Sequence, residues 1–273
     1  MPNDGSEKTL AERINEEFTR VYAPYELPDF KYEPRSENEL PQFDDKRLDV
    51  LAYQVELRRK EDIHAGSSLA GREIYANLIE MLKTEKGVHI ENLLAVIGSV
   101  GGFWLMRAVM EGMKAVVNSG IVAGENTVAV VGEALSIYIC DTKSGEKYLF
   151  GDKIAREFCS FYMTAAKTSE PPFDTLKPLS ACAAQTAGTP EYWKTPFDDK
   201  VGRSPRELSE MFREKFFEIF DVFCRYPQER MLAWAIAAQT AVEQASSVIT
   251  PNGKETALSI IAEYGWRTAH FFG

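Results

Sequence analysis

The 273-residue chain has few of the residues from which metal and redox sites are built, with only 3 histidines and 4 cysteines. No two histidines lie close together, so the H-E-x-x-H zinc motif is excluded. No cysteine pair has the C-x-x-C spacing of a zinc or thiol-redox site. The sequence therefore predicts no metal and no cofactor.

The chain also lacks the common phosphate-binding loops. Neither G-x-x-x-x-G-K-[ST] nor G-x-G-x-x-G after a strand occurs. The densest basic run, Arg58 to Lys60, is followed at once by two acidic residues, and the formal net charge is −10. Nucleic-acid binding needs a concentrated basic surface, and an acidic chain is repelled by anionic lipid. We therefore expect neither nucleic acid nor a membrane as a partner.

The beginning of the sequence shows no apolar segment typical of a signal peptide, because Met1 to Lys8 is polar. We expect a cytoplasmic protein with reduced thiols. The longest uncharged stretch, Asn92 to Met106, is shorter than the ~20 residues that span a bilayer. It predicts a buried central helix instead.

The remaining pattern predicts a mainly α-helical fold. Leu10, Ile14 and Phe18 recur at helical spacing. Residues 23–45 then combine four prolines with interleaved aromatics, which predicts an extended arm on the body of the protein or on a neighbouring subunit. A peptide-like ligand for another protein is the alternative. We divide the chain into an N-terminal helix and arm (1–45) and a compact multi-helix domain (46–273).

One β-hairpin is expected near the middle of the chain, at about residues 135–150. Leu135 to Cys140 and Glu146 to Phe150 have strand composition, and the residues between them have turn composition. The preceding segment, Asn126 to Val131, fits either a short strand or the start of a helix. Its β-branched valines favour the strand.

Gly98 and Gly102 form a G-x-x-x-G pair inside the apolar helix. A glycine in a helix interior costs about 1 kcal/mol, and close approach of another backbone is the usual compensation. That backbone belongs either to a helix of the same chain or to a second copy. Together with the arm, this helix face predicts a homo-oligomer.

Several short motifs lie between residues 89 and 264: G-S-V-G-G at Gly98 to Gly102, K-Y-L-F-G-D at Lys147 to Asp152, G-T-P at Gly188 to Pro190, and the spacing of Trp234 and Gln239. With these motifs the chain resembles an uncharacterised family of bacterial helical proteins with no assigned activity. The resemblance implies a helical fold with a hairpin. It implies no catalytic residues.

The best sequence candidate for chemistry is the segment around His64, Ser67 and Ser68. Histidine beside serine is the pairing of a base with a nucleophile, and a helix start offers N–H groups to an anion. No orienting acid is evident, and Ser68 fits the N-cap of a helix over residues 68–86.

Three further residues are weaker candidates. Cys182 lies among small residues, where a cysteine is usually packed as a small hydrophobe. Gln239 and Glu243 are polar positions on an otherwise apolar helix, and they fit either the lining of an internal pocket or a solvent-facing side. Taken together, these observations favour a non-enzymatic binding or protein-interaction protein of the bacterial cytoplasm. The alternative is a small-molecule enzyme using His64 and Ser67, or Cys182.

Overall fold

A computed structural model of the chain describes residues 8, 10–118, 127–131, 137–141, 147–149, 152–249 and 251–270. The fold is mainly α, as predicted. The helices are α1 (Leu10–Tyr22), α2 (Lys46–Arg58), α3 (Ala65–Leu82), α4 (Ile90–Asn118), α5 (Asp152–Ala166), α6 (Phe173–Thr186), α7 (Asp198–Val201), α8 (Pro205–Phe212), α9 (Phe217–Phe223), α10 (Pro227–Val248) and α11 (Gly253–Ala269). Short 3-10 turns occupy Pro24–Glu26, Glu37–Glu39, Pro190–Trp193 and Arg213–Phe216.

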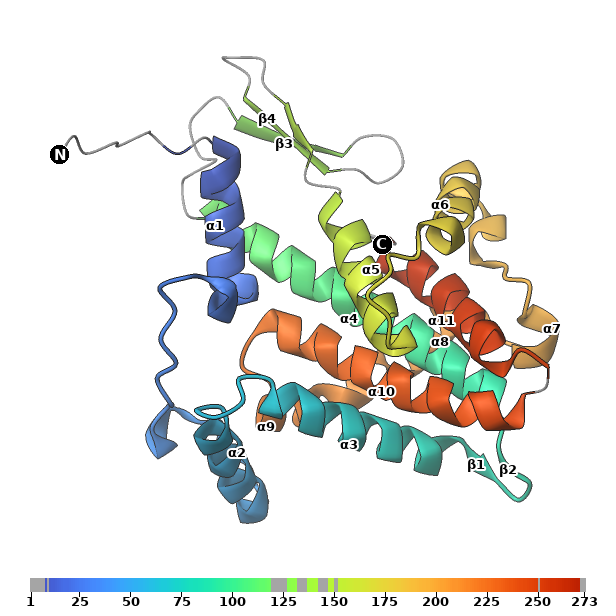
Figure 1. The fold of residues 1–273 in the computed structure, drawn as a ribbon, viewed down its shortest axis with the longest axis horizontal. Helices are drawn as coiled ribbons and strands as arrows, with labels where there is room; N and C mark the ends of the chain where they lie inside the picture. Colours follow the sequence, from blue (N-terminus) through green and yellow to red (C-terminus); the bar gives the residue numbers. More distant parts are fainter. Residues whose placement is uncertain are drawn as a thin grey trace.

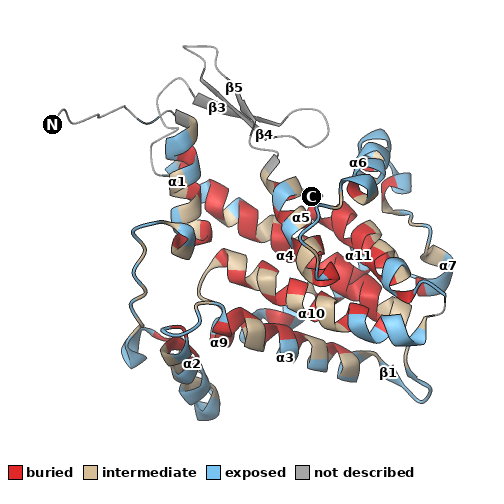
Figure 2. Ribbon diagram, in the orientation of Figure 1, coloured by how far each residue is buried: buried red, intermediate tan, exposed pale blue. Residues whose placement is uncertain are grey.

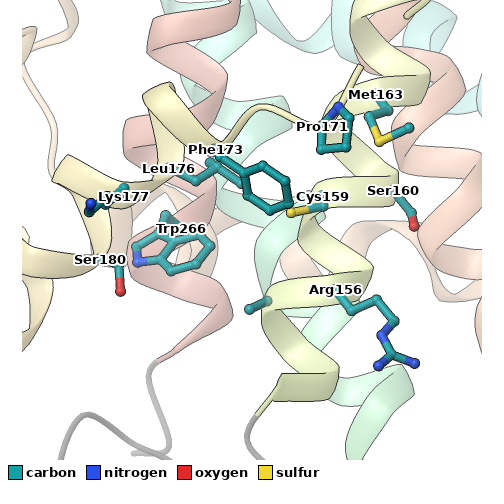
Figure 3. Close-up of a pocket in the computed structure, with 11 residues that line it drawn as sticks. Arg156, Cys159, Ser160, Met163, Pro171, Phe173, Leu176, Lys177, Ser180 and Trp266 are labelled. Carbon is teal, nitrogen blue, oxygen red and sulfur yellow. The ribbon is translucent and has the colours of Figure 1, made fainter. Parts of the chain in front are cut away.

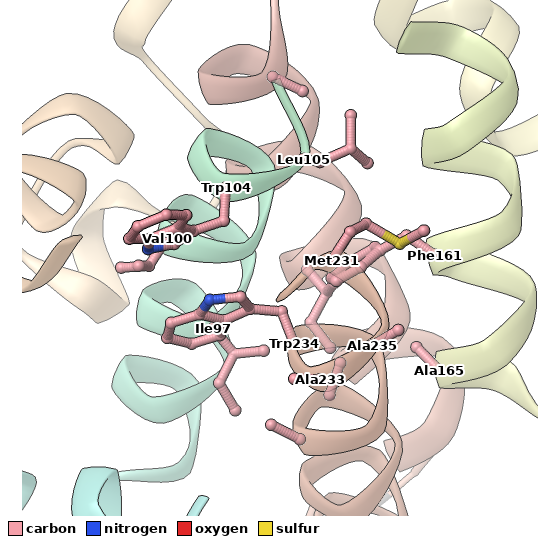
Figure 4. Packing of buried hydrophobic residues seen from close by; sticks show 14 of the residues in the cluster. Ile97, Val100, Trp104, Leu105, Phe161, Ala165, Met231, Ala233, Trp234 and Ala235 are labelled. Atoms are coloured by element: carbon pink, nitrogen blue, oxygen red, sulfur yellow. The ribbon is translucent and has the colours of Figure 1, made fainter. Parts of the chain in front are cut away.

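Helix α4 is the centre of the hydrophobic core. It packs against α10, α11, α1 and α8 (Figure 1). Buried positions concentrate on α4, α10 and α11 (Figure 2). In the middle of this core, Trp104 of α4 and Trp234 of α10 are 1% and 0% exposed (Figure 4). The uncharged segment Asn92 to Met106 therefore forms part of a buried central helix, as predicted.

The glycine face of α4 is covered by α11 of the same chain. A Cβ added at Gly98 would lie 2.8 Å from the carbonyl oxygen of Ile261, and one at Gly102 would overlap the carbonyl oxygen of Gly265. Only glycine permits backbones to approach so closely. The backbone that approaches Gly98 and Gly102 therefore belongs to a helix of the same chain.

Over Ile90–Val116, α4 is long and apolar enough to cross a membrane by length and composition alone. However, 78% of the relevant window is buried within the protein. A core helix surrounded by other helices gives this result, so α4 is weak evidence for a membrane span and is compatible with a soluble protein.

The N-terminal segment belongs to the same core. Ile14, Phe18 and Tyr22 of α1 are each at most 3% exposed. The arm after α1 then lies on the body of its own chain. There the Tyr32 hydroxyl donates to the Glu56 carboxylate at 2.5 Å.

The predicted hairpin is present as β4 (Ile137–Asp141) and β5 (Lys147–Leu149), which pair antiparallel. The segment with two alternatives forms a third strand, β3 (Thr127–Val131), paired with β4. The expected turn falls on residues 142–146, outside the described residues. A small ladder of β1 (Lys83–Thr84) and β2 (Gly87–Val88), not predicted, joins α3 to α4.

The expected start of α3 was wrong. The helix begins at Ala65, with His64 at the N-cap position, instead of at Ser68. Asp62 supplies the local polar contact, because its carboxylate accepts from the His64 N–H at 2.9 Å. Ser67 and Ser68 consequently lie within the first turn of the helix.

Candidate functional site

The structure separates the environments of His64 and Ser67. The His64 side chain is exposed, and its ring packs edge-on against Tyr25 at 5.1 Å between centroids. Ser67 is 0% exposed, and its hydroxyl has no hydrogen-bond partner among the described residues. No hydrogen bond between the two side chains is present in the described part of the chain, so the geometry does not assemble a base and nucleophile.

Cys182 lies on the exposed side of α6. Its sulfur is 3.9 Å from Nη2 of Arg267 on α11. The same Arg267 nitrogen donates to the Glu263 carboxylate at 3.2 Å. The guanidinium therefore already has an anionic partner beside the thiol.

Glu243 and Gln239 have different surroundings on α10. Glu243 is exposed and forms an ion pair with Lys167. Gln239 is half-buried and lines an open hollow of about 600 Å³. Gln239 is thus a sequence candidate that lies at a concave surface.

The main candidate site is an apolar cavity of about 700 Å³ between α5, α6 and α11 (Figure 3). Ligand pockets commonly measure about 300–1,000 Å³. Helix α5 supplies one wall, α6 and the preceding Pro171 supply the opposite wall, and α11 supplies Trp266. The cavity is lined by Ala155, Arg156, Cys159, Ser160, Met163, Pro171, Phe173, Leu176, Lys177, Ser180 and Trp266.

The inner wall of this cavity is apolar and well supported. Leu176 and Trp266 are 5% and 6% exposed. Behind the cavity, the Trp266 ring packs against Phe158 at 5.3 Å and against His270 at 4.1 Å between centroids. Burial lowers the pKa of His270 to about 4, so this ring is neutral at physiological pH. The inner wall is therefore apolar and uncharged, and the Phe158 and His270 rings pack against its Trp266 side chain.

Phe173 stands at the mouth of the cavity. This large side chain is 67% exposed, and Figure 3 shows its ring between Cys159 and Trp266. Two prolines precede it and end the connection from α5, so the start of α6 is fixed beside α5. An exposed aromatic ring beside an apolar cavity gains favourable burial when a ligand covers it.

The polar groups of the cavity lie at its rim, and no carboxylate is among the described residues that line it. Arg156 and Lys177 are both exposed, on α5 and α6 respectively. Among the residues that the structure describes, neither forms an ion pair. The cavity thus carries two cations in a chain whose net charge is −10.

The hollow at Gln239 adjoins this cavity. Ser160 and Met163 line both. The hollow is otherwise polar, with Thr164, Lys167, Thr168, Ser169 and Gln239. An apolar cavity and a hydrogen-bonding hollow therefore meet along α5.

A second polar cluster lies beneath the arm, and its charges are buried and paired. Glu56 of α2 and Arg59, at the C-cap of that helix, are 1% and 2% exposed, and Glu229 of α10 is 0% exposed. Arg59 pairs with Glu229, whose other carboxylate oxygen accepts from the Tyr226 N–H at 3.0 Å and so caps α10. Arg35 Nη2 of the arm reaches Glu56 at 2.8 Å.

The electrostatics of Glu56 follow from these contacts. Burial alone would raise the pKa of its carboxyl, but hydrogen bonds from Tyr32 and Arg35 outweigh burial and hold the pKa below its ordinary value. The cluster therefore keeps a buried carboxylate ionised. Arg59 Nε has no hydrogen-bond partner among the described residues and lies 3.8 Å from the Glu56 carboxylate. Both carboxylates of the cluster are engaged by the chain itself, which favours a structural role for it.

Sequence reasoning missed the main cavity, although it singled out Gln239 beside it. The lining residues of α5, α6 and α11 lie far apart in the sequence and form no motif. In the described part of the chain, no group of three His, Cys, Asp or Glu side chains is placed to hold a metal ion. The weak local signal was Pro171 and Pro172 followed by Phe173, an aromatic residue at a helix start.

No family model, curated protein or solved structure matches the chain. The resemblance based on the motifs between residues 89 and 264 therefore stays a prediction.

Proposed function

We propose that the chain is a non-enzymatic binding protein that holds a small, largely apolar ligand in the cavity between α5, α6 and α11. This proposal rests on one observation, the cavity of about 700 Å³ between these helices. Trp266 and Leu176 form its inner wall, and the exposed Phe173 lies at its mouth. Covering such surface removes apolar area from water, which is the main driving force for binding of this kind.

A cavity-filling variant tests this function. Ala155 lines the cavity, so Ala155→Trp places a large ring in the space that the ligand needs. We expect this variant to weaken the binding of a neutral apolar fluorophore, 1-aminoanthracene, by at least about tenfold, because overfilled space no longer accepts the ring. Fluorescence titration measures the affinity.

The matched control is Ala184→Trp, which introduces the same ring at an exposed position of α6 outside the lining. It should bind the fluorophore as the unmodified chain does. Circular dichroism checks that both variants keep their helices. Equal affinity in all three proteins, or no binding in any, would refute a ligand site in this cavity.

The alternative function, a small-molecule enzyme using His64 and Ser67 or Cys182, has less support. His64 is exposed while Ser67 is buried, and none of the three lines the cavity. The bacterial cytoplasm remains the proposed location, on the cysteine pattern and the resemblance of the motifs between residues 89 and 264.

Homo-oligomerisation through the arm and the Gly98/Gly102 face also remains a proposal. Both surfaces already contact the chain's own body, the first through Glu56 and the second through α11. Because the Gly98/Gly102 face is buried under α11, a second copy would meet the exposed side of the arm.

A further inference from the structure

The charged side chains that line the cavity and the adjoining hollow, in the described part of the chain, are all of one sign. Arg156 and Lys177 are its charged lining residues, and Lys167 is the charged residue lining the adjoining hollow. Lys167 is paired with Glu243, whereas Arg156 and Lys177 form no ion pair among the described residues. In an acidic chain, such a concentration of positive potential beside an apolar cavity complements a ligand that joins an apolar body to an anionic group.

Helix α5 turns different sides toward the apolar and polar spaces. Arg156 and Ser160 are one helical turn apart and project from the same side of the helix, away from Trp266 (Figure 3). Cys159 projects toward Trp266 and Phe173 in the same view (Figure 3). A ligand that fills the cavity thus meets a guanidinium and a hydroxyl where it passes over the edge of α5.

The polar surface continues from that edge. Ser160 belongs to both spaces, and beyond it lie the Gln239 amide and the Ser169 hydroxyl. Lys177 and Ser180 line the cavity from α6 and do not line the Gln239 hollow. A guanidinium also binds a carboxylate through two parallel N–H donors, which an ammonium group does not match.

From this arrangement we propose that the ligand is an anionic amphiphile, with a hydrocarbon body in the cavity and a carboxylate at Arg156 and Ser160. This proposal rests on the proposed function and adds the class and orientation of the ligand. The Lys177 rim is then the end near which the hydrocarbon lies, and the hollow at Gln239 accepts any further polar part of the headgroup.

Three ligands of equal chain length isolate the contribution of charge: octanoate, 1-octanol and octylammonium. Isothermal titration calorimetry on the full chain at low salt should show octanoate binding about fivefold tighter than 1-octanol and octylammonium binding weakest. In 1 M NaCl the advantage of octanoate should fall, since the Debye length shrinks to about 3 Å.

The orientation is tested with two substitutions that remove the same charge. Arg156→Gln should weaken octanoate binding about fivefold and leave 1-octanol binding unchanged, while Lys177→Gln should change octanoate binding less than about twofold. Equal affinities for octanoate and 1-octanol would overturn the anionic class. A loss in Lys177→Gln as large as in Arg156→Gln would overturn the orientation.

These outcomes differ from failure of the proposed function itself. If 1-octanol binds and Ala155→Trp abolishes that binding, the cavity is a ligand site whatever the charge of the ligand. If none of the three ligands binds, both proposals fall together. Binding that is insensitive to Ala155→Trp places the ligand elsewhere on the chain and also overturns both.

Discussion

Two regions of the molecule differ in how their charged side chains are buried and paired. Beneath the arm, Arg59 and Glu229 are buried and paired, and Glu56 receives Tyr32 and Arg35. At the α5–α6–α11 cavity, Arg156 and Lys177 are exposed beside apolar surface, and the described lining residues include no carboxylate. The first arrangement satisfies charge within the chain, and the second leaves it available to something from outside.

The difference follows from the energetics of burial. Removing an ion from water is costly, so a buried charge is retained only with a partner and well-placed hydrogen bonds. An exposed charge stays hydrated and needs no partner to be tolerated. The buried cluster therefore holds the arm in place. The cations at the rim of the cavity contribute little to the free energy of folding.

The largest expected effect comes from breaking the buried pair. Arg59→Met removes the partner of Glu229 and leaves a carboxylate that is 0% exposed without its counter-ion. We expect the free energy of unfolding to fall by about 3–5 kcal/mol. Urea denaturation followed by circular dichroism measures it.

The control for this change is an exposed ion pair of the same kind. Arg47 pairs with Asp45, and its side chain is 90% exposed. Arg47→Met should leave the free energy of unfolding nearly unchanged, because an exposed ion pair is screened by solvent. Similar costs for the two substitutions would mean that burial does not set the value of the Arg59 pair, and the contrast between the two regions would fail.

A second prediction uses two buried glutamates with opposite pKa shifts. Glu157 of α5 accepts the Tyr22 hydroxyl at 2.8 Å, but burial dominates and raises its pKa. The charged form is thus disfavoured in the folded state. The contribution of Glu157 to the free energy of unfolding is therefore complete below pH 4.5, the ordinary pKa of the group. It is lost as the pH rises through the folded pKa. The pKa of Glu56 is lowered, so its contribution is present above pH 4.5 and is lost as the pH falls through its folded value.

Gln substitutions should therefore give opposite pH profiles. Relative to the unmodified chain, Glu157→Gln should become progressively more favourable as the pH rises above 4.5, because an amide still accepts from Tyr22 and carries no charge. Glu56→Gln should be destabilising at neutral pH and less so in acid. Urea denaturation between about pH 3 and pH 8 compares them; parallel profiles would contradict the assignment.

The sequence predicted features that depend on neighbouring residues, such as single helices. It did not predict contacts between segments that are far apart in the chain. The uncharged segment after His89 indicated the central helix, and the Gly98/Gly102 pair indicated a close backbone contact. Neither identified α11 as the partner, because packing between distant helices leaves no periodic signal in one sequence. The start of α3 was misplaced since Ser68 has the composition of an N-cap, whereas Asp62 provides the contact at the observed start.

The candidate site was less predictable than the fold. Arg156, Phe173 and Trp266 meet because three helices converge, and each residue alone has an ordinary alternative on a solvated or buried helix face. Gln239 was recognised only as a polar residue on an apolar helix, which fits a pocket and a surface equally well. A concave surface is a property of the packed chain, and it becomes visible only when the helices are placed together.

The smallest expected effect concerns the stability of the rim cations. Arg156→Gln and Lys177→Gln should each change the free energy of unfolding by less than about 0.5 kcal/mol, because each side chain is exposed and forms no ion pair among the described residues. Arg230 of α10 gives an intermediate case, since it is 25% exposed and its Nη1 lies 2.8 Å from Glu111. Arg230→Gln should cost about 1 kcal/mol in the same urea titration. Arg59, Arg230 and Arg156 then form a series in which the cost of removing the charge follows its burial and pairing. If Arg156→Gln destabilised the chain more than Arg230→Gln, Arg156 would have a structural role, and its availability to a ligand would lose its physical basis.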